Sequence, residues 1–383
     1  MRVYTFGESQ AEGSATMISE LGGKGAGLAD MCLVGVPVPA GFTISTEACR
    51  SFYKADQTFP DILADEIERG VQHIERITGR TLGDPDNPLL ISVRSGAAIS
   101  MPGMMDTILN VGLNRSSIDG LQKAGSGDLF AYDSYRRFLE MFAEIALDVD
   151  PALFASVREE VLSLTRCKSV EQLDAQWHNN LAHAYENALE QAGVWLPSEP
   201  RAQLRLAIIG VFRSWNTPRA IRYRRANQIP DDLGTAVTVQ GMVFGNLGPG
   251  SATGVAFTRD PNTGAPGLFG EYLPQAQGED VVSGRFTPRP IIGGEDCLSD
   301  IAPDACAELI RISTLLENHH GCVQDLEFTV ERGQLWMLQT RPAKCSVRAA
   351  VRIAVDMVEE GLITREEALL RVAPDDLTRL LHP

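Results

Sequence analysis

The clearest alternation of apolar and polar positions lies near the end of the chain, in "QDLEFTVERGQLWMLQTRP". In the first half of this stretch, Leu326 and Phe328 alternate with Asp325 and Glu327. Successive side chains of a strand point to opposite faces, so the two carboxylates share one face and the apolar pair the other. A second alternating run follows directly, and the two runs together predict a β-hairpin.

The register of this hairpin depends on the length of its turn. We predict the three-residue loop Arg332-Gly333-Gln334, because such loops need a residue in the left-handed conformation and Gly333 supplies it. A slip of one residue would turn every side chain to the other face, so a register error of even one residue would be visible in the structure. The pairs that it gives are Glu327 with Gln339, Asp325 with Arg341, and Glu331 with Leu335.

The middle of the chain has a different pattern, with apolar positions at helical spacing from about residue 121 to Gly193. On either side, short apolar runs alternate with glycine-rich turns, which predicts mixed strands and helices. A helix is expected from about Gly25, a strand in "PLLISVRS", and two last helices at about 347–360 and 364–371. The pattern therefore predicts an α+β fold with an inserted helical part.

Composition limits the function. The 383 residues carry a net charge of −16, which argues against a general nucleic-acid binder because such proteins present basic surfaces. Seven cysteines without a C-x-x-C pair are typical of reduced thiols in the cytoplasm. We see no signal or transit peptide and no apolar run long enough for a membrane span. A cytoplasmic protein with no membrane and no nucleic-acid partner is expected.

Two glycine-rich segments carry candidate phosphate-binding cations. Lys24 stands in "GGKGAG", which opens a helix but lacks Walker A spacing, and a solvated lysine in a turn is the alternative. Arg94 ends the apolar run before "SGAAISMPGMMDT", where a mobile glycine loop could close over phosphates. A structural ion pair is the alternative for Arg94. The loop methionines, among them Met101, could instead fill gaps in a neighbouring core.

The predicted hairpin face and three further segments add candidate groups. Asp325, Glu327 and Gln339 offer the oxygen ligands that Mg²⁺ prefers, although a solvated polar face is equally compatible with the spacing. "AVTVQGMV" could be a strand whose backbone reads an adenine, and the acidic groups of "GEYLPQAQGEDVV" could meet a ribose or a metal; a surface turn is the alternative there. "RSWNTPRAIRYRR" is a basic run in an acidic chain, and either a solvated helix face or an anion- or partner-facing patch.

In this order, the motifs resemble the pyruvate phosphate dikinases. The matching stretches include "LGGKGAGLADM", "ISVRSGAAISMPGMMDTILNVGLN", "GTAVTVQGMVFGN", "GEYLPQAQGEDVVSG" and "QDLEFTVERGQLWMLQTRPAK". The loop "MPGMMDT" is the specific feature, since phosphoenolpyruvate synthases and antibiotic phosphotransferases differ there. The resemblance implies an ATP-grasp fold of two mixed α/β lobes. Its expected parts are an N-terminal lobe (1–112), a helical subdomain (113–199), a return to that lobe and hinge (200–243), a C-terminal lobe with the metal-binding hairpin (244–344) and a helical linker (345–383).

The resemblance also implies a reaction. In that family the nucleotide-binding domain uses ATP and inorganic phosphate to phosphorylate a histidine on a swivelling domain, with release of AMP and diphosphate and with Mg²⁺ as cofactor. Catalytic roles fall to Lys24, Arg94 and Arg341, and metal binding to Asp325, Glu327 and Gln339. The expected ATP-binding residues are Lys24, Arg94, Gly96, Ser100, Met101, Gly103, Asp106, Gln240, Met242, Val243 and Glu279.

The phosphoryl acceptor is left open by the sequence. No stretch resembles the phosphohistidine domain, which we expect in cis in a full-length protein or in trans. Two alternatives stand beside this hypothesis: a free-standing ATP-grasp kinase of a small molecule, and a nucleotide-binding module without turnover.

Overall fold

A computed structural model describes residues 2–59, 61–123, 127–282, 284 and 286–372. The chain forms two compact units, one of residues 1–34 and 39–242 and the other of residues 35–38 and 243–383. Each described unit combines helices with an antiparallel sheet, so the α+β prediction is confirmed. Parts of the expected domains lie outside the described residues: residues 1, 60, 124–126, 283, 285 and 373–383.

The first unit is built on a six-stranded sheet of order β2-β1-β3-β6-β4-β5 in the described chain. Every pairing in it is antiparallel. The strands are β1 (Val3–Gly7), β2 (Gln10–Ala11), β3 (Gly41–Ile44), β4 (Ile91–Gly96), β5 (Thr107–Val111) and β6 (Ala236–Gly241).

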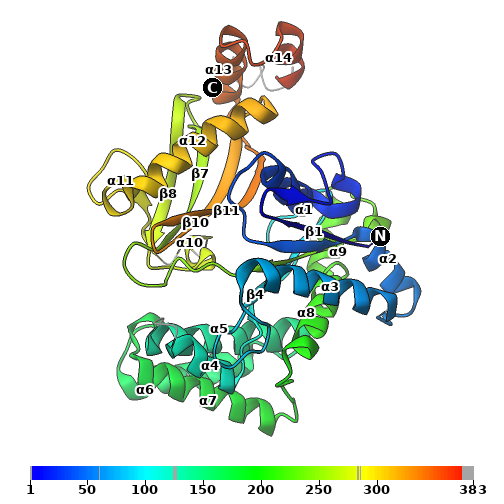
Figure 1. Cartoon of the computed structure of the whole chain (residues 1–383), viewed down its shortest axis with the longest axis vertical. Coiled ribbons are helices and arrows are strands. Elements are labelled where there is room, and N and C mark those ends of the chain that lie inside the picture. Colours follow the sequence, from blue (N-terminus) through cyan, green and yellow to red (C-terminus); the bar gives the residue numbers. More distant parts are fainter. Residues whose placement is uncertain (1, 60, 124–126, 283, 285, 373–383) are drawn as a thin grey trace. The chain divides into compact units, whose positions relative to one another are not determined.

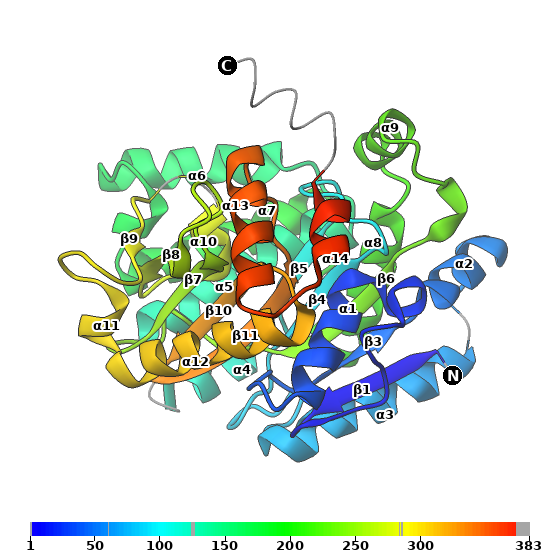
Figure 2. The same cartoon turned by 90° about the horizontal axis from the view of Figure 1, so that it is seen from above.

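Helices cover both faces of this sheet. Gly25 of α1 (Ile18–Leu33) faces Thr43 of β3, and Gly70 of α3 (Asp61–Thr78) faces the neighbouring Phe42. Adjacent residues of a strand point to opposite faces, so α1 and α3 lie on opposite sides of β3, as Figure 2 shows. A Cβ at either glycine would come within 2.8 Å of β3 side-chain atoms, so both contacts need glycine. The same unit contains α2 (Thr46–Lys54).

The predicted helical stretch is confirmed in the described residues. Figure 1 shows α5, α6 and α7 lying together, away from β1 and α1 in the same unit. Aromatic side chains form the core here, with Phe154 of α6 edge-on to Tyr185 of α7 at 4.8 Å between ring centroids. The elements are α4 (Arg115–Leu121), α5 (Asp128–Ala146), α6 (Ala152–Thr165), η2 (Val170–Gln172), α7 (Ala175–Gln191), α8 (Pro200–Ser214), α9 (Pro218–Ala226) and η3 (Asp231–Leu233).

A buried histidine makes the stability of this helical part depend on pH. The Nδ1 atom of His178 on α7 lies 3.5 Å from the carboxylate of Asp133 on α5, and the His178 side chain is 3% exposed. Burial lowers the pKa of His178 below its ordinary 6.5; Asp133 opposes this effect, while Arg136 and Arg137 add to it. In the pH range below 6.5, the folded protein therefore binds fewer protons at His178 than the unfolded chain does. The free energy of unfolding should fall as the pH falls through this range.

We predict that His178→Gln removes this part of the acid sensitivity. The difference from wild type should reach at most about 1.4 kcal/mol per pH unit, the limit for one proton. The measurement is the free energy of unfolding by urea at about pH 7 and about pH 5.5. Parallel pH profiles for variant and wild type would contradict the assignment.

The second unit is built on a five-stranded antiparallel sheet of order β11-β10-β7-β8-β9 in the described chain. On one face, Leu326 and Phe328 are fully buried, and α12 (Pro303–His320) lies across the sheet in Figure 1. Asp325 and Glu327 belong to the other face. The remaining elements are β7 (Ala252–Arg259), β8 (Pro266–Pro274), β9 (Arg289–Pro290), β10 (Gln324–Glu331), β11 (Gln334–Pro342), α10 (Gly278–Val282), α11 (Leu298–Ile301), α13 (Val347–Glu359) and α14 (Arg365–Arg371).

The hairpin of β10 and β11 corrects the predicted turn. Its loop has two residues, Arg332 and Gly333, both with positive φ, and Glu331 pairs with Gln334 rather than Leu335. Positive φ at both positions is the geometry of a tight hairpin turn with the twist of the flanking strands. A register shift between Glu327 and Phe328, opposite Leu338, then restores the other pairs. Glu327 therefore lies across from Gln339 and Asp325 across from Arg341, as predicted.

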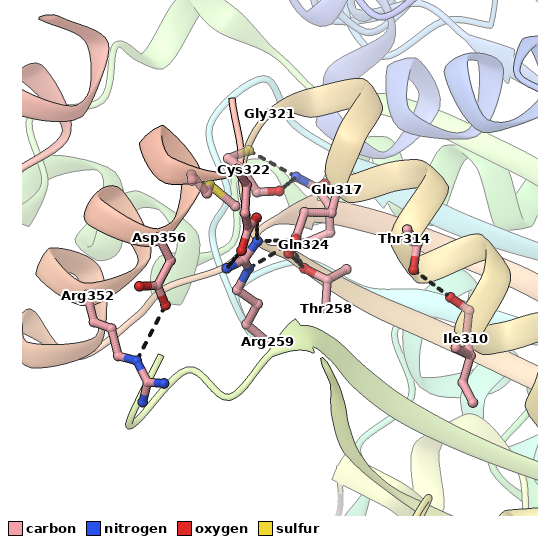
Figure 3. A network of polar contacts seen from close by, with 12 residues as sticks. Thr258, Arg259, Ile310, Thr314, Glu317, Gly321, Cys322, Gln324, Arg352 and Asp356 are labelled. Carbon is pink, nitrogen blue, oxygen red and sulfur yellow. Dashed lines mark hydrogen bonds and ion pairs between the residues drawn. The ribbon is translucent and has the colours of Figure 1, made fainter. Parts of the chain in front are cut away.

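The two last helices, α13 and α14, confirm the predicted pair. A charged network joins the end of α13 to the sheet and to α12. Arg259 of β7 donates to Glu317 of α12 at 2.8 Å and also pairs with Glu360, which follows α13. Figure 3 shows Arg259 beside Glu317 and Thr258, whose hydroxyl donates to the same glutamate at 2.5 Å. The Arg259 side chain is 3% exposed, so its charge depends on these partners.

We predict that Glu317→Ala lowers the free energy of unfolding by about 3–5 kcal/mol, because it leaves the Arg259 charge buried with fewer partners. Glu308 provides a matched control on the same helix, since it pairs with Arg311 at the surface. Glu308→Ala should change stability by less than about 1 kcal/mol. Chemical denaturation of both variants measures the difference, and equal losses would contradict the role given to burial.

Two general features agree with the sequence. All seven cysteines are free thiols. Within the described ranges, no helix is long and apolar enough to cross a membrane.

Candidate functional site

In the first unit, the site begins with a kink in α1. Gly22 has φ 67° and ψ 168°, which breaks the helix inside its span. The helix that follows the kink starts close to the predicted position at about Gly25, and a short helical segment from Ile18, which the sequence did not predict, precedes the kink. A Cβ at Gly22 would lie 1.8 Å from the carbonyl oxygen of Gly96, and the Gly23 N–H donates to Ala97 at 3.0 Å. The kink thus rests on the chain that leaves β4, and no side chain fits there.

This backbone contact brings two predicted site segments together. A Cβ at Gly96 would lie 3.4 Å from the Cβ of Lys24, so the half-buried lysine stands beside the first residue of the predicted phosphate loop. The Gly96 N–H donates to the Thr235 hydroxyl at 3.2 Å, which fixes the loop at its start. Lys24 and the end of β4 therefore form one cluster.

Arg94 joins this cluster from inside β4. Its guanidinium donates to the Oε1 atom of Gln240 on the neighbouring strand β6, and Gln240 in turn donates from Nε2 to the Pro39 carbonyl at 2.8 Å. Both side chains are buried. The sequence suggested that the backbone of this strand, at Gln240 and beyond, lies along an adenine. The Gln240 side chain itself is directed to Arg94. Gln240 therefore orients the guanidinium.

The middle of the loop is divided between exposed and buried residues. Ser100 and Gly103 are exposed. Met101 is buried in an apolar cluster with Trp215, Ala220 and Ile229, against which Met104 and Met105 also pack. These methionine side chains therefore fill space in a neighbouring apolar core, which was the alternative left open by the sequence. Because the cluster belongs to α8, α9 and their connections, it holds the loop on the helical side of the unit.

The far end of the loop is fixed by Asp106. Its carboxylate pairs with Arg219 of α9, and its N–H donates to the Ser214 hydroxyl at 3.4 Å. Burial raises the pKa of Asp106, and Arg219 opposes that effect. The basic run of the sequence thus contains two structural arginines: Arg219, and Arg224, whose guanidinium lies 4.2 Å from the Trp215 ring centroid. Arg222 and Arg225 of that run are exposed.

Met242 and Val243 lie on either side of the division between the units. The Met242 N–H donates to the Leu90 carbonyl at 2.9 Å. A backbone contact from Met242 to a base would therefore come from its carbonyl oxygen.

In the second unit, the predicted metal residues are neighbours on one face of the sheet. The Nε2 atom of Gln339 donates to the Oε1 atom of Glu327 at 3.1 Å, which turns the two side chains toward each other. Arg341 donates from Nε to the Asp325 carboxylate at 2.8 Å. Two carboxylates and an amide oxygen are hard oxygen donors, and this donor set fits Mg²⁺.

The short helix α10 lies over the same face. A Cβ at Gly278 would lie 3.9 Å from the hydroxyl oxygen of Thr253, which pairs across the strands with Thr329. Thr329 is two residues from Glu327 and therefore shares its face. The half-buried Glu279 of α10 thus belongs to the same side of the sheet as the predicted metal residues.

Comparison with known proteins decides the family. The chain matches the family described as "Pyruvate phosphate dikinase, AMP/ATP-binding domain" over residues 18–74, 56–296 and 293–362. It belongs to this family. It is 49% identical to a pyruvate, phosphate dikinase of Rhizobium meliloti (strain 1021) and to pyruvate, phosphate dikinase 2 of Zea mays. A chloroplastic pyruvate, phosphate dikinase 1 of Oryza sativa subsp. japonica is also 49% identical.

The match covers 100% of this chain but 43%, 43% and 40% of these three relatives. The chain therefore spans less than half the length of the dikinases that it resembles.

Glu271, one of the acidic groups of "GEYLPQAQGEDVV" that could meet a ribose or a metal, lies on the same sheet face of this dikinase-family chain as Glu327. Val255 of β7 pairs with Glu327 on one side and with Glu271 of β8 on the other. Residues paired across antiparallel strands point to the same face, so Glu271 lies in the same row as Glu327 and Gln339. The alternation within "LFGEYLP" shows that Glu271 faces away from the buried Tyr272, but only the strand pairing shows which row it joins.

Proposed function

We propose that this chain is the nucleotide-binding part of a pyruvate phosphate dikinase-like phosphotransferase. It uses ATP and inorganic phosphate to phosphorylate a histidine on a separate swivelling domain and releases AMP and diphosphate. One observation carries the proposal: the kink at Gly22 rests on Gly96 and sets Lys24 beside the strand end that carries Arg94. Membership in the dikinase nucleotide-binding family supports the same function.

The first unit supplies cations. Phosphoryl transfer needs positioning and charge neutralisation more than covalent help from the protein. Lys24 and Arg94 hold phosphate oxygens, and Gln240 keeps the Arg94 guanidinium in one orientation. Residues 97–105, which include Ser100, Met101 and Gly103, form the lid over the phosphates between the anchors at Gly96 and Asp106.

The second unit supplies oxygen ligands. Asp325, Glu327 and Gln339 hold Mg²⁺, and Arg341 stands beside the phosphates while it balances the Asp325 charge. When bound, the metal neutralises phosphate oxygens and orients them. The chain's own residues then fix the nucleotide against this face.

The residues of β10 suggest how the nucleotide lies along the sheet. Alternate residues of a strand are about 7 Å apart, so Asp325, Glu327, Thr329 and Glu331 form a line on one face. Glu331 accepts the Phe244 N–H at 2.6 Å, next to Val243. If the phosphates lie at Glu327 and the base lies toward Val243, the sugar lies between them, at Thr329 and its cross-strand neighbour Thr253. Helix α10, with Glu279, covers this part of the face.

Membership in the dikinase nucleotide-binding family supports a finer description of the fold. We propose an ATP-grasp fold with an N-terminal lobe of residues 1–112, a helical subdomain of residues 113–199, a return segment of residues 200–243, a C-terminal lobe of residues 244–344 and a helical linker from residue 345. The seven free cysteines are compatible with a reducing compartment such as the cytoplasm.

Incubation of the chain with ATP, Mg²⁺ and inorganic phosphate, with and without a histidine domain from a dikinase relative, tests the function. We expect AMP formation and a phosphorylated histidine domain only in the complete mixture. Transfer to a small molecule with ADP as product would indicate a free-standing kinase. Nucleotide binding without any product would indicate a binding module.

A further inference from the structure

The second unit contains a glutamine whose side-chain amide is buried without a partner. Gln277, directly before α10, is 4% exposed. Neither its Nε2 nor its Oε1 atom has a hydrogen-bond partner among the described residues. Its backbone is well fixed, because the N–H donates to the Asp280 carboxylate at 2.9 Å and the carbonyl accepts the Asp280 N–H at 2.9 Å.

Such an amide is unusual in a folded protein. Most buried side-chain polar atoms have a partner, because an unpaired buried group keeps its full desolvation penalty. Here both the donor and the acceptor of one side chain lack a partner within the described chain. An amide of this kind fits a ligand group that both accepts and donates.

A second amide lies on an adjoining segment. The Oδ1 atom of Asn246 is also buried and unpartnered among the described residues. A Cβ at Gly245 would lie 2.4 Å from the carbonyl oxygen of Ala276, so the segment that carries Asn246 touches the one that carries Gln277. The unpartnered amide of Gln277 and the unpartnered Oδ1 atom of Asn246 therefore lie on either side of one backbone contact.

We propose that Gln277 binds a ribose hydroxyl of the nucleotide. This inference rests on the proposed function and assigns a residue to the sugar. A hydroxyl donates one hydrogen bond and accepts others, which matches the two free functions of the amide. Gln277 adjoins Gly278, and a Cβ at Gly278 would lie 3.9 Å from Thr253, in the row of the sheet where the sugar is expected.

Gln277→Met tests the proposal, because it keeps the length of the side chain and removes both polar functions. Loss of an unpaired buried amide should leave the thermal midpoint of the free chain unchanged or raise it. ATP binding, measured by calorimetry with Mg²⁺, should weaken by roughly tenfold. Wild type should bind ATP more tightly than either 2′-deoxy-ATP or 3′-deoxy-ATP, and the variant should lose that preference.

Gln203 provides a matched control. It is a fully buried glutamine of α8 whose amide accepts the Gly112 N–H at 3.0 Å and donates to the Leu113 and Pro197 carbonyls. Gln203→Met should lower the thermal midpoint and keep the preference for ATP over the deoxy analogues.

The outcomes separate this proposal from the function on which it rests. Wild type that binds no ATP would contradict the proposed function. Wild type that binds ATP, with a Gln277→Met variant of equal affinity, would overturn the Gln277 assignment alone and indicate a structural water. An equal loss of affinity for ATP and both deoxy analogues would overturn the ribose contact and place Gln277 at another part of the nucleotide.

Discussion

Arg94→Ala is expected to reduce phosphoryl transfer to the histidine domain by about 3–5 kcal/mol in the transition state, with the chain still folded. The reason is that the guanidinium is buried and oriented by Gln240, so it supplies a fixed charge that water cannot replace. Lys24→Ala should cause a loss of similar size. Lys24 is half-buried, so its removal disturbs the core less than removal of Arg94.

Single-turnover transfer rates and thermal unfolding of the same preparations measure these effects. Arg311→Ala is the control, since it removes one exposed cation from α12. It should leave the transfer rate unchanged. Near-normal rates in Arg94→Ala or Lys24→Ala would remove that residue from the proposed site, and a loss equalled by Arg311→Ala would indicate a general charge effect.

Glu327→Gln is expected to raise the Mg²⁺ concentration needed for transfer by roughly 10–100-fold and to lower the maximal rate. The substitution keeps the shape of the side chain but removes the charge that faces Gln339. Its effect should therefore fall on metal binding rather than on the hairpin. Binding of Mn²⁺ in the presence of ATP, followed by electron paramagnetic resonance, gives a measurement independent of transfer.

Glu308→Gln is the matched control, because Glu308 is a glutamate with a side-chain partner, Arg311, at the surface of α12. It should bind Mn²⁺ as wild type does. If Glu327→Gln also binds Mn²⁺ and transfers phosphate normally, the row of Glu327 and Gln339 is only a polar surface, which is the alternative that the sequence left open.

The hairpin shows how far sequence reasoning reaches. The alternation placed Asp325 and Glu327 on one face and predicted their partners correctly. The predicted three-residue turn and its Glu331–Leu335 pair were wrong, because the loop has two residues. Beyond the register shift opposite Leu338, the pairs are the same as a three-residue loop would give. Alternation reports which face a residue takes, but a shift inside one strand leaves no distinct pattern.

The cluster around Arg94 shows that contacts between residues far apart in the sequence could not be predicted. "GGKGAG" and "SVRSG" were recognised as separate candidates, and the α+β class followed from the alternation of strands and helices. Gln240 is 146 residues from Arg94, and Arg219 is 113 residues from Asp106. Such pairs depend on strand order and helix packing, which no local spacing reveals. The same holds for Gln277, whose lack of a partner is visible only in the folded chain.

The fate of inorganic phosphate tests the central claim most directly. The chain is mixed with a dikinase histidine domain, ATP, Mg²⁺ and ³²P-labelled inorganic phosphate, and the reaction is quenched within one turnover. We predict one labelled diphosphate and one phosphorylated histidine for each AMP formed. Label that stays in inorganic phosphate while ADP accumulates would contradict the dikinase half-reaction.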